Sequence, residues 1–269
     1  MIRLLIAVVG IALFITLVQS TLAAFGQARG EDEDEAPPMP ERRDAEGVAD
    51  WMHARVMDAF ALEREGWALE RAARVEARLQ AGATEEERLR VAILWIPEVT
   101  AFTFGRHVYL SRRLLERVGT DEPVAFVVAH EMAHHALGHL LSRNRWIDRF
   151  ARVPAGGLVA GAVIEAARLG YNVEQELDAD AWALRRCFAA GYDPRACLGV
   201  LDVLEADALD RGDLSGVYGP VPADVDAGPD LGDSVRQWLA KRERGYPPLL
   251  ERRQRLMEIA EELVAGDQP

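Results

Sequence analysis

The segment AHEMAHHALGH at residues 129–139 constrains the fold more than any other, because it holds four of the six histidines in a chain of 269 residues. It lies in a run that begins near Thr120, has Pro123 at its start and carries apolar side chains on every face thereafter. Such a pattern predicts a helix that is buried on all sides. Polar groups inside a buried helix are costly without partners, so another segment must supply partners for these histidines.

His130 and His134 have the spacing of two metal ligands. Residues four apart lie on neighbouring turns of one helix face, with Cβ atoms about 5–6 Å apart, and this separation suits two ligands of one tetrahedral zinc ion. Glu131 follows the first histidine and can reach the open coordination position, where a carboxylate accepts a proton from a bound water. Chance spacing in a histidine-rich helix is the alternative, and burial of the helix disfavours it.

A site of this kind needs a third protein ligand. A metzincin would have glycine at position 137 and histidine at position 140, and this chain has leucine at both. The remaining option is a carboxylate on a later helix, where the stretch EQELDADAWAL offers Glu174, Glu176, Asp178 and Asp180. Because Glu176 and Asp180 are four apart, one can face the metal while the other accepts the free N–H of a ligand histidine. Alone, this acidic cluster would be more typical of a solvated helix face; after an H-E-x-x-H segment, metal ligation explains it better.

The rest of the chain predicts a mostly helical α+β domain with one small sheet. Residues 90–111 are rich in β-branched and aromatic side chains and contain Pro97 and Gly105, which predicts two or three short strands. Residues 153–171 are apolar but rich in glycine, and we expect a buried or membrane-touching hairpin there. Helical periodicity predicts further helices at 48–79, either continuous or broken at Gly66, at about 172–190, from near Arg195, and in the C-terminal stretch PPLLERRQRLMEIAEELV.

The N-terminal part of the chain is expected to precede the folded domain. Residues 1–29 contain an apolar run from Leu4 to Val18 with Arg3 before it, which predicts a cleaved signal peptide or an uncleaved membrane anchor. The lack of a clean A-x-A cleavage site favours the anchor, and the positive-inside rule predicts that the rest of the chain lies outside the cytoplasm. Residues 30–46 are acidic and proline-rich and predict a linker, so the folded domain is expected at 47–265.

Composition restricts the partners of the chain and leaves its redox state open. The formal net charge of −13 disfavours the basic face that nucleic-acid binding requires. Cys187 and Cys197 are the two cysteines of the chain. In an oxidising compartment they could form a disulfide, and two small buried thiols are an equally consistent alternative because a sequence does not supply the required geometry.

The two motifs together, HEMAHHALGH and then ELDADAWAL about 40 residues later, resemble the gluzincin metallopeptidase family of the HtpX heat-shock protease, the Oma-type mitochondrial protease and the CAAX prenyl protease. The resemblance covers roughly residues 48–265 and includes the segment FTFGRHVYLS and the turn AGYDP. The long membrane insert of CAAX-type members is missing. The resemblance implies a zincin-like metallopeptidase domain with a small sheet packed on the active-site helix, and a place among the small envelope members.

The resemblance also implies roles for individual residues. It makes His130, His134 and Glu176 the ligands of one Zn2+ ion. It makes Glu131 the general base and Asp180 the carboxylate that supports a ligand histidine.

One departure from the family lies near the C-terminus. The family commonly has His-Pro followed by an arginine five residues after the proline, whereas this chain has Tyr246, Pro247 and Arg252. We expect Arg252 and Tyr246 to donate hydrogen bonds to the oxyanion of the tetrahedral intermediate. The replacement of the family histidine by Tyr246 puts the family role of that position in doubt.

The other histidines and one long loop have less specific interpretations. We assign His135 and His139 to helix packing or to support of the site, His107 to an exposed strand position and His53 to the surface. The stretch 211–233, rich in Gly, Pro and Asp, is expected to be a surface loop, or a lid that keeps the enzyme latent.

Together these observations predict a zinc-dependent metalloendopeptidase whose polypeptide substrate lies extended against an edge strand, expected at Val108–Leu110. Loose specificity and the family resemblance favour unfolded or misassembled envelope proteins as substrates. The alternative is a membrane-tethered chaperone-like or binding module with a latent or structural zinc site. Structural zinc usually has four protein ligands, so a fourth ligand near Tyr246 or His139 would favour that alternative.

Overall fold

The computed structural model describes residues 45–84, 88–139, 171–210, 212 and 247–266. The chain divides into two compact units, Met1–Pro38 and Met39–Pro269, and every described residue lies in the second. Among the described helices, none is both long enough and apolar enough to cross a membrane.

Several of the predicted features lie outside the described residues. They are the signal peptide or anchor, nearly all of the linker, the hairpin segment except Tyr171, the lid except Gly212, and Tyr246.

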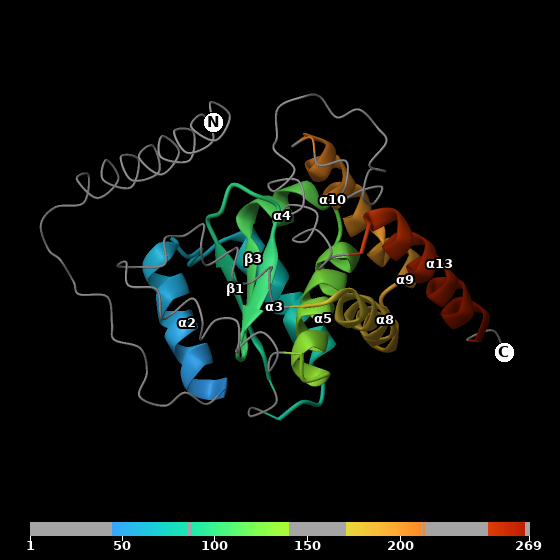
Figure 1. Cartoon of the computed structure of the whole chain (residues 1–269). Helices are drawn as coiled ribbons and strands as arrows, with labels where there is room; N and C mark the ends of the chain where they lie inside the picture. Colours follow the sequence, from blue (N-terminus) through green and yellow to red (C-terminus); the bar gives the residue numbers. More distant parts are fainter. Residues whose placement is uncertain (1–44, 85–87, 140–170, 211, 213–246, 267–269) are drawn as a thin grey trace, which may run out of the picture. The chain divides into compact units, whose positions relative to one another are not determined.

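The described part is a mostly helical α+β structure with a three-stranded sheet, as predicted (Figure 1). Its elements in chain order are α2 (Ala45–Ala59), α3 (Trp67–Leu79), β1 (Arg90–Leu94), β2 (Ala101–Phe104), β3 (His107–Ser111), α4 (Arg112–Arg117), α5 (Asp121–Ala136), α8 (Val173–Ala189), α9 (Pro194–Cys197), α10 (Gly199–Asp210) and α13 (Leu249–Gly266).

The predicted break in the first helical region is at Gly66. Its φ of 101° lies where side chains with a Cβ are disfavoured, so glycine ends the connection from α2 and begins α3. The short helix α4 was not predicted from the sequence. Its N-cap is Ser111, whose side-chain oxygen accepts a hydrogen bond from the backbone N–H of Leu114.

The sheet has the strand order β1-β3-β2, with β1 parallel and β2 antiparallel to β3. The prediction that Val108–Leu110 forms an edge strand is therefore wrong. Both sides of β3 are paired, and Val108, Tyr109 and Leu110 are each 0% exposed. The physical reason is that the parallel partner comes from before the β2–β3 hairpin, a long-range pairing that the local pattern of the hairpin does not reveal.

Side chains alternate between the two faces of the sheet and enter two separate cores. On one face, Phe102, Phe104 and Tyr109 pack with Met52 and Val56 of α2. On the other face, residues such as Ile93, Val108 and Leu110 join the larger core built from α3, α5, α8 and the C-terminal helices. The sheet is therefore covered on both faces, and α5 lies in the larger core.

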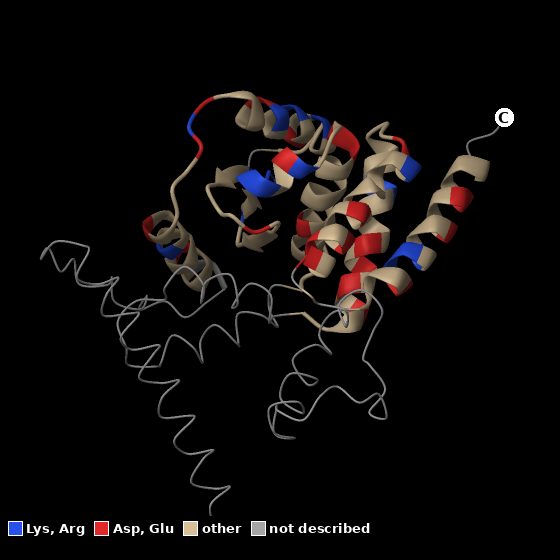
Figure 2. Cartoon of the chain, turned by 90° about the horizontal axis from the view of Figure 1, so that it is seen from above, with Lys and Arg blue, Asp and Glu red and all other residues tan. Residues whose placement is uncertain are grey.

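Helix α5 is surrounded by other helices, as its apolar sequence predicts. It packs along α8 and against α3, and α13 packs on α8 (Figure 1). Charged residues occur mainly on the outer helix faces, and Figure 2 shows acidic and basic positions side by side on α13. There Arg253 pairs with Asp202 and Glu205 of α10.

Two sequence interpretations are refined by the fold. Cys187 and Cys197 are both free and buried, and the contact with Cys197, together with burial, raises the pKa of the Cys187 thiol. His53 and His107 are partly buried instead of exposed. Their rings stack with centroids 3.8 Å apart, and Nδ1 of His53 lies 2.5 Å from the Tyr109 hydroxyl.

Candidate metal centre

Two helices supply the predicted ligands. His130 and His134 lie on the last two turns of α5, and Glu176 lies on the first turn of α8. A capping box fixes the start of α8, since the Asn172 side chain accepts from the backbone N–H of Gln175 while the Gln175 side chain accepts from the backbone N–H of Asn172. This cap sets where Glu176 enters the contact between the helices.

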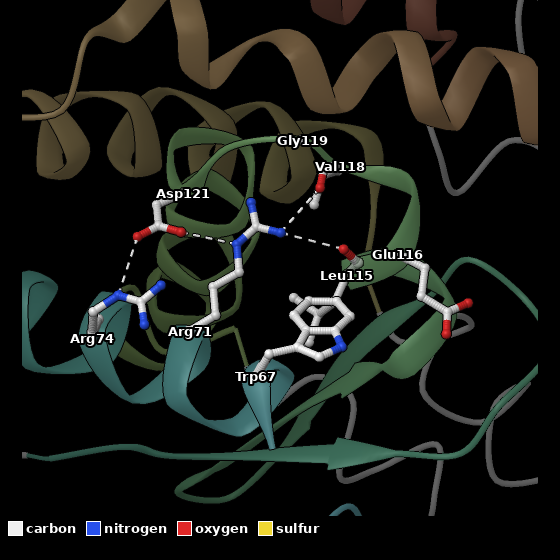
Figure 3. Close-up of a pocket in the computed structure, with 8 residues that line it drawn as sticks. All are labelled: Trp67, Arg71, Arg74, Leu115, Glu116, Val118, Gly119 and Asp121. Atoms are coloured by element: carbon white, nitrogen blue, oxygen red, sulfur yellow. Dashed lines mark hydrogen bonds and ion pairs between the residues drawn. The ribbon is translucent and has the colours of Figure 1, made fainter.

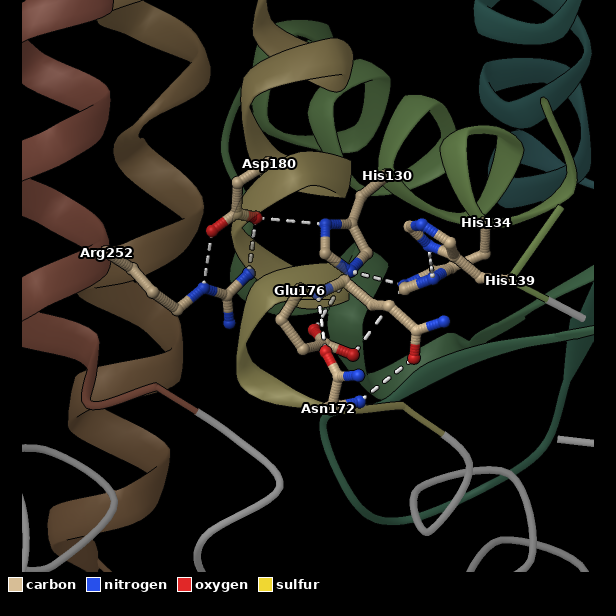
Figure 4. Close-up of polar contacts among 8 residues, drawn as sticks. His130, His134, His139, Asn172, Glu176, Asp180 and Arg252 are labelled. Carbon is tan, nitrogen blue, oxygen red and sulfur yellow. Dashed lines mark hydrogen bonds and ion pairs between the residues drawn. The ribbon is translucent and has the colours of Figure 1, made fainter. Parts of the chain in front are cut away.

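The three side chains converge on one point (Figure 4). The Nε2 atoms of His130 and His134 are 3.1 Å apart. The carboxylate of Glu176 lies 3.3 Å from the first of these nitrogens and 3.7 Å from the second. One ligand atom from each residue lies within 4.8 Å of the others, and all three residues are buried.

The residues present fit a divalent cation. Glu176 is 0% exposed, and apart from the ring nitrogens of His130 and His134 its carboxylate oxygens have no hydrogen-bond partner among the described residues. A buried carboxylate without compensation is strongly disfavoured. A cation bound by two imidazole nitrogens and one carboxylate would compensate this charge, and that ligand set is the one zinc takes in His2Glu sites.

Asp180 and Arg252 stand behind His130. Asp180 Oδ1 lies 2.9 Å from Nδ1 of His130, on the side of the ring that faces away from Glu176. Arg252 donates to both carboxylate oxygens of Asp180, from Nε and from Nη2, each at 2.7 Å. A carboxylate in this place orients the histidine and fixes its tautomer.

Charge pairing sets the protonation of these groups. Burial opposes ionisation of Asp180, but the charge of Arg252 and its hydrogen bonds outweigh this effect and lower the pKa of Asp180 to about 2. For His130, burial acts to lower the pKa, and the hydrogen bonds to Asp180 and Glu176 overcome it and raise the pKa to about 10. In the absence of metal, a proton on His130 therefore offsets part of the carboxylate charge, and a zinc ion held by His130, His134 and Glu176 would replace that proton.

Arg252 has a partner that the sequence analysis did not predict. Arg252 is 6% exposed. Two nitrogens of its guanidinium group donate hydrogen bonds to Asp180. The geometry thus gives Arg252 a positioning task, and its predicted contact with the oxyanion gains no support from it.

The four acidic residues of the α8 motif separate by helix face. Glu176 and Asp180 are buried and point toward α5, whereas Glu174 and Asp178 are exposed. The alternative prediction of a solvated acidic helix face therefore holds for Glu174 and Asp178 only. Glu131, one position after His130, is 7% exposed, and its role as general base stays a prediction.

His134 has partners that sequence reasoning did not assign to it. Its Nδ1 lies 3.1 Å from Nδ1 of His139, and the ring of Tyr171 stacks on it with centroids 3.6 Å apart. His139 contacts the ring nitrogen that faces away from His130, so it is not a fourth ligand of the group. The sequence signal for the His139 contact was its position five residues after His134, with a glycine just before it. No local sequence pattern indicated the contact of Tyr171 with His134.

A pocket of about 500 Å3 lies at the other end of α5 (Figure 3). Its walls include Trp67, Arg71, Arg74 and Asp121. Arg71 donates to Asp121 at 2.9 Å and to the carbonyl of Val118 at 3.0 Å. These contacts join α3 to the start of α5, and we assign them to the stability of the fold.

Comparison with known proteins identifies the family. The profile of Peptidase family M48 matches residues 64–260, a range that contains the three ligands together with Asp180 and Arg252. A search of curated proteins found no match to the chain. The profile match covers most of the chain and agrees with the metal site. The chain therefore belongs to peptidase family M48 and is a zinc metallopeptidase, with His130, His134 and Glu176 placed to hold the metal ion.

Proposed function

We propose that this metallopeptidase is an endopeptidase that cuts unfolded or misassembled polypeptides on the periplasmic side of the cell envelope. The observation that carries the proposal is the ligand set. Three residues converge on the metal position, and the described part of the chain adds no fourth. Catalytic zinc sites have three protein ligands and leave one position for water or substrate, whereas structural sites have four.

The chemistry follows from the residues around this position. Bound zinc supplies a Lewis acid for the scissile carbonyl and lowers the pKa of a water molecule. Glu131 takes the proton of the attacking water and passes it to the leaving amine. Asp180, held by Arg252, keeps Nε2 of His130 directed at the ligand group.

The substrate is proposed to lie along β2 instead of β3. In the described structure, the outer edge of β1 is partly covered, because Leu62 bridges to Leu94 and the backbone N–H of Glu63 donates to the carbonyl of Ile93. Strand β2 is the other edge of the sheet and contacts α5. A strand edge binds the backbone of an extended peptide, so a substrate must be unfolded locally and can vary in sequence.

The proposed location rests on the N-terminal sequence. Arg3 followed by an apolar run from Leu4 to Val18 fits a segment that enters a membrane with its N-terminus on the cytoplasmic side. The peptidase domain would then meet substrates outside the cytoplasm, either tethered to the membrane or released into the periplasm.

The test uses the full chain as wild type, Glu131→Gln and Glu174→Gln. The last variant makes the same chemical change at an exposed position of α8 and serves as the control. We would measure bound zinc, and cleavage of casein and of one globular protein in its folded and unfolded forms. The expected result is one zinc in each protein, with chelator-sensitive cleavage of unfolded substrates by wild type and Glu174→Gln only.

Three results would each contradict a part of the proposal. Zinc bound in all three proteins without cleavage of any unfolded substrate would favour the binding or latent alternative. Equal cleavage of the folded and unfolded forms would contradict the proposed substrate class. Cleavage of a reporter by cells in which the protein is exposed only to the cytoplasm, and not by cells that export it, would contradict the location.

A further inference from the structure

We propose that His139 and Tyr171 are positioning residues that hold the ligand histidine His134 in its metal-binding orientation. His139 acts through a hydrogen bond to the outer ring nitrogen, and Tyr171 acts through its ring face. The inference rests on the zinc site and is independent of the substrate class and location proposed above.

The hydrogen bond has a defined direction once metal is bound. Nε2 of His134 faces His130 and Glu176, and Nδ1 faces Nδ1 of His139 at 3.1 Å. A neutral imidazole that binds metal through Nε2 carries its hydrogen on Nδ1. His134 must therefore donate and His139 must accept, which leaves the hydrogen of His139 on Nε2. In this tautomer His139 does for His134 what Asp180 does for His130.

The end of α5 places His139 in this position. The backbone N–H of His139 donates to the carbonyl of His134 at 2.9 Å, and that of Gly138 donates to His135 at 3.1 Å. With φ of 72° at Gly138, this is a Schellman motif, in which glycine takes the left-handed conformation after the last helical residue. The chain turns back over the last turn of α5, and the His139 side chain is only 8% exposed.

Tyr171 approaches His134 from the segment just before α8. Its ring is nearly parallel to the imidazole, with an interplanar angle of 8°, and the residue is 8% exposed. It directly precedes Asn172, the N-cap of α8. The connection that begins the helix of Glu176 thus also fixes the ring plane of His134, so two ligands of one metal are set by a single turn.

The two ligand histidines consequently differ in their outer partners. His130 has an ionised carboxylate that is itself held by Arg252, whereas His134 has a neutral ring acceptor and a stacked phenol. A ring acceptor supports the orientation of His134 and adds no negative charge to the site. Loss of such an outer partner typically weakens metal binding by about 10–100-fold.

The test measures the zinc dissociation constant of the full chain by chelator competition, and the visible spectrum of the cobalt-substituted protein. His139→Asn places an amide oxygen where Nδ1 lies and keeps the acceptor. His139→Leu introduces a side chain of similar volume that has no hydrogen-bond acceptor. Tyr171→Phe keeps the stacked ring, and Tyr171→Leu does not. His135→Leu, at the exposed neighbouring position, is the matched control, and thermal unfolding of the metal-free forms checks that each variant folds.

We expect His139→Leu and Tyr171→Leu to bind zinc about 10–100-fold more weakly and to shift the cobalt spectrum. His139→Asn, Tyr171→Phe and His135→Leu should stay close to wild type in both measurements. The inference is overturned if His139→Leu binds zinc as tightly as His135→Leu, or if His139→Asn is as weak as His139→Leu, since packing alone would then explain the effect. Zinc binding by a wild type that cuts no substrate would count against the proposed function only.

Discussion

Two pairs of histidines lie in this molecule in opposite surroundings. His130 and His134 have their rings 4.8 Å apart between α5 and α8, beside the buried carboxylates of Glu176 and Asp180. His53 and His107 stack at 3.8 Å between α2 and the sheet. There the pKa of His107 falls to about 4, through burial first and then the neighbouring His53, Arg90 and Arg106.

The comparison shows that close histidines are not enough to make a metal centre. In the first pair, carboxylates on a neighbouring helix raise the pKa of His130 to about 10, and the site attracts positive charge. In the second pair, burial and nearby guanidinium groups repel positive charge, and the rings serve packing. The difference lies in the residues that tertiary structure brings to each pair.

The largest expected effect comes from removal of the buried carboxylate that faces both ligand nitrogens. Glu176→Gln keeps the shape of the side chain and removes its charge, so zinc binding should weaken by more than the roughly 100-fold upper range for outer partners. Chelator competition would measure this effect. Glu174→Gln, on the exposed face of α8, should bind zinc like wild type, and equal loss in both variants would contradict the assigned ligand.

A second large effect is expected on stability. Arg252→Met leaves Asp180 buried without its guanidinium partner, which should cost about 3–5 kcal/mol in the free energy of unfolding. Urea unfolding of the zinc-free proteins would measure it. Arg253→Met removes a partly exposed guanidinium one residue away and should cost at most about 1 kcal/mol.

A double variant sharpens this prediction. Addition of Asp180→Asn to Arg252→Met removes the unpaired charge, and part of the lost stability should return. If the double variant were as unstable as the sum of the two single variants, the ion pair would not be the cause.

A smaller effect is expected at the turn that places His139. Gly138→Ala puts a Cβ on a residue with φ of 72°, which should cost about 1–2 kcal/mol. Among the described residues, no atom beyond the two chain neighbours lies within 4 Å of that Cβ position, so the cost would come from the backbone conformation. Gly199→Ala, without a positive φ and with ordinary contact to Pro123, should be neutral or slightly stabilising. Equal destabilisation by both changes would argue against the turn.

The smallest effect is a pH dependence that sets the two pairs apart. The pKa of His107 is lower in the folded protein, about 4, than its ordinary value of 6.5. Between these values the unfolded chain binds more protons, so stability falls as pH falls from 6.5 toward 4. His107→Phe keeps a ring against His53 and should flatten this part of the urea-midpoint profile; an unchanged slope would contradict the assignment.

His130, in the other pair, titrates in a different pH window. Because the pKa of His130 is raised in the metal-free protein, its contribution is fully present below about pH 6.5 and is lost as pH rises toward 10. The contribution of His130 is therefore constant across the acid window in which His107 titrates.

Much of the site follows from local periodicity. H-E-x-x-H puts His130 and His134 on one helix face, and the four-residue spacing of Glu176 and Asp180 does the same on α8. The strand edge was predicted wrongly because the pairing of β1 with β3 joins segments that are distant in sequence. Hydrophobic alternation does not show which of three strands lies in the centre.

Contacts between distant segments account for the remaining differences. The C-terminal motif was interpreted without its partner, and the structure pairs Arg252 with Asp180 across 72 positions; the oxyanion contact of Arg252 stays a prediction. Tyr171 lies outside every motif, and its stacking on His134 depends on how α8 begins beside the end of α5.

The sequence by itself determined the helix and the two histidines of the metal site, because α-helical spacing is a local property of the chain. The choice of Glu176 among the four carboxylates of the later helix came from the family resemblance. Only the tertiary structure decided which groups stand behind each ligand: Asp180 with Arg252 behind His130, and His139 with Tyr171 behind His134. The physical reason is that desolvation and hydrogen-bond geometry depend on which helices meet, and burial makes those few contacts decisive for how each imidazole binds metal.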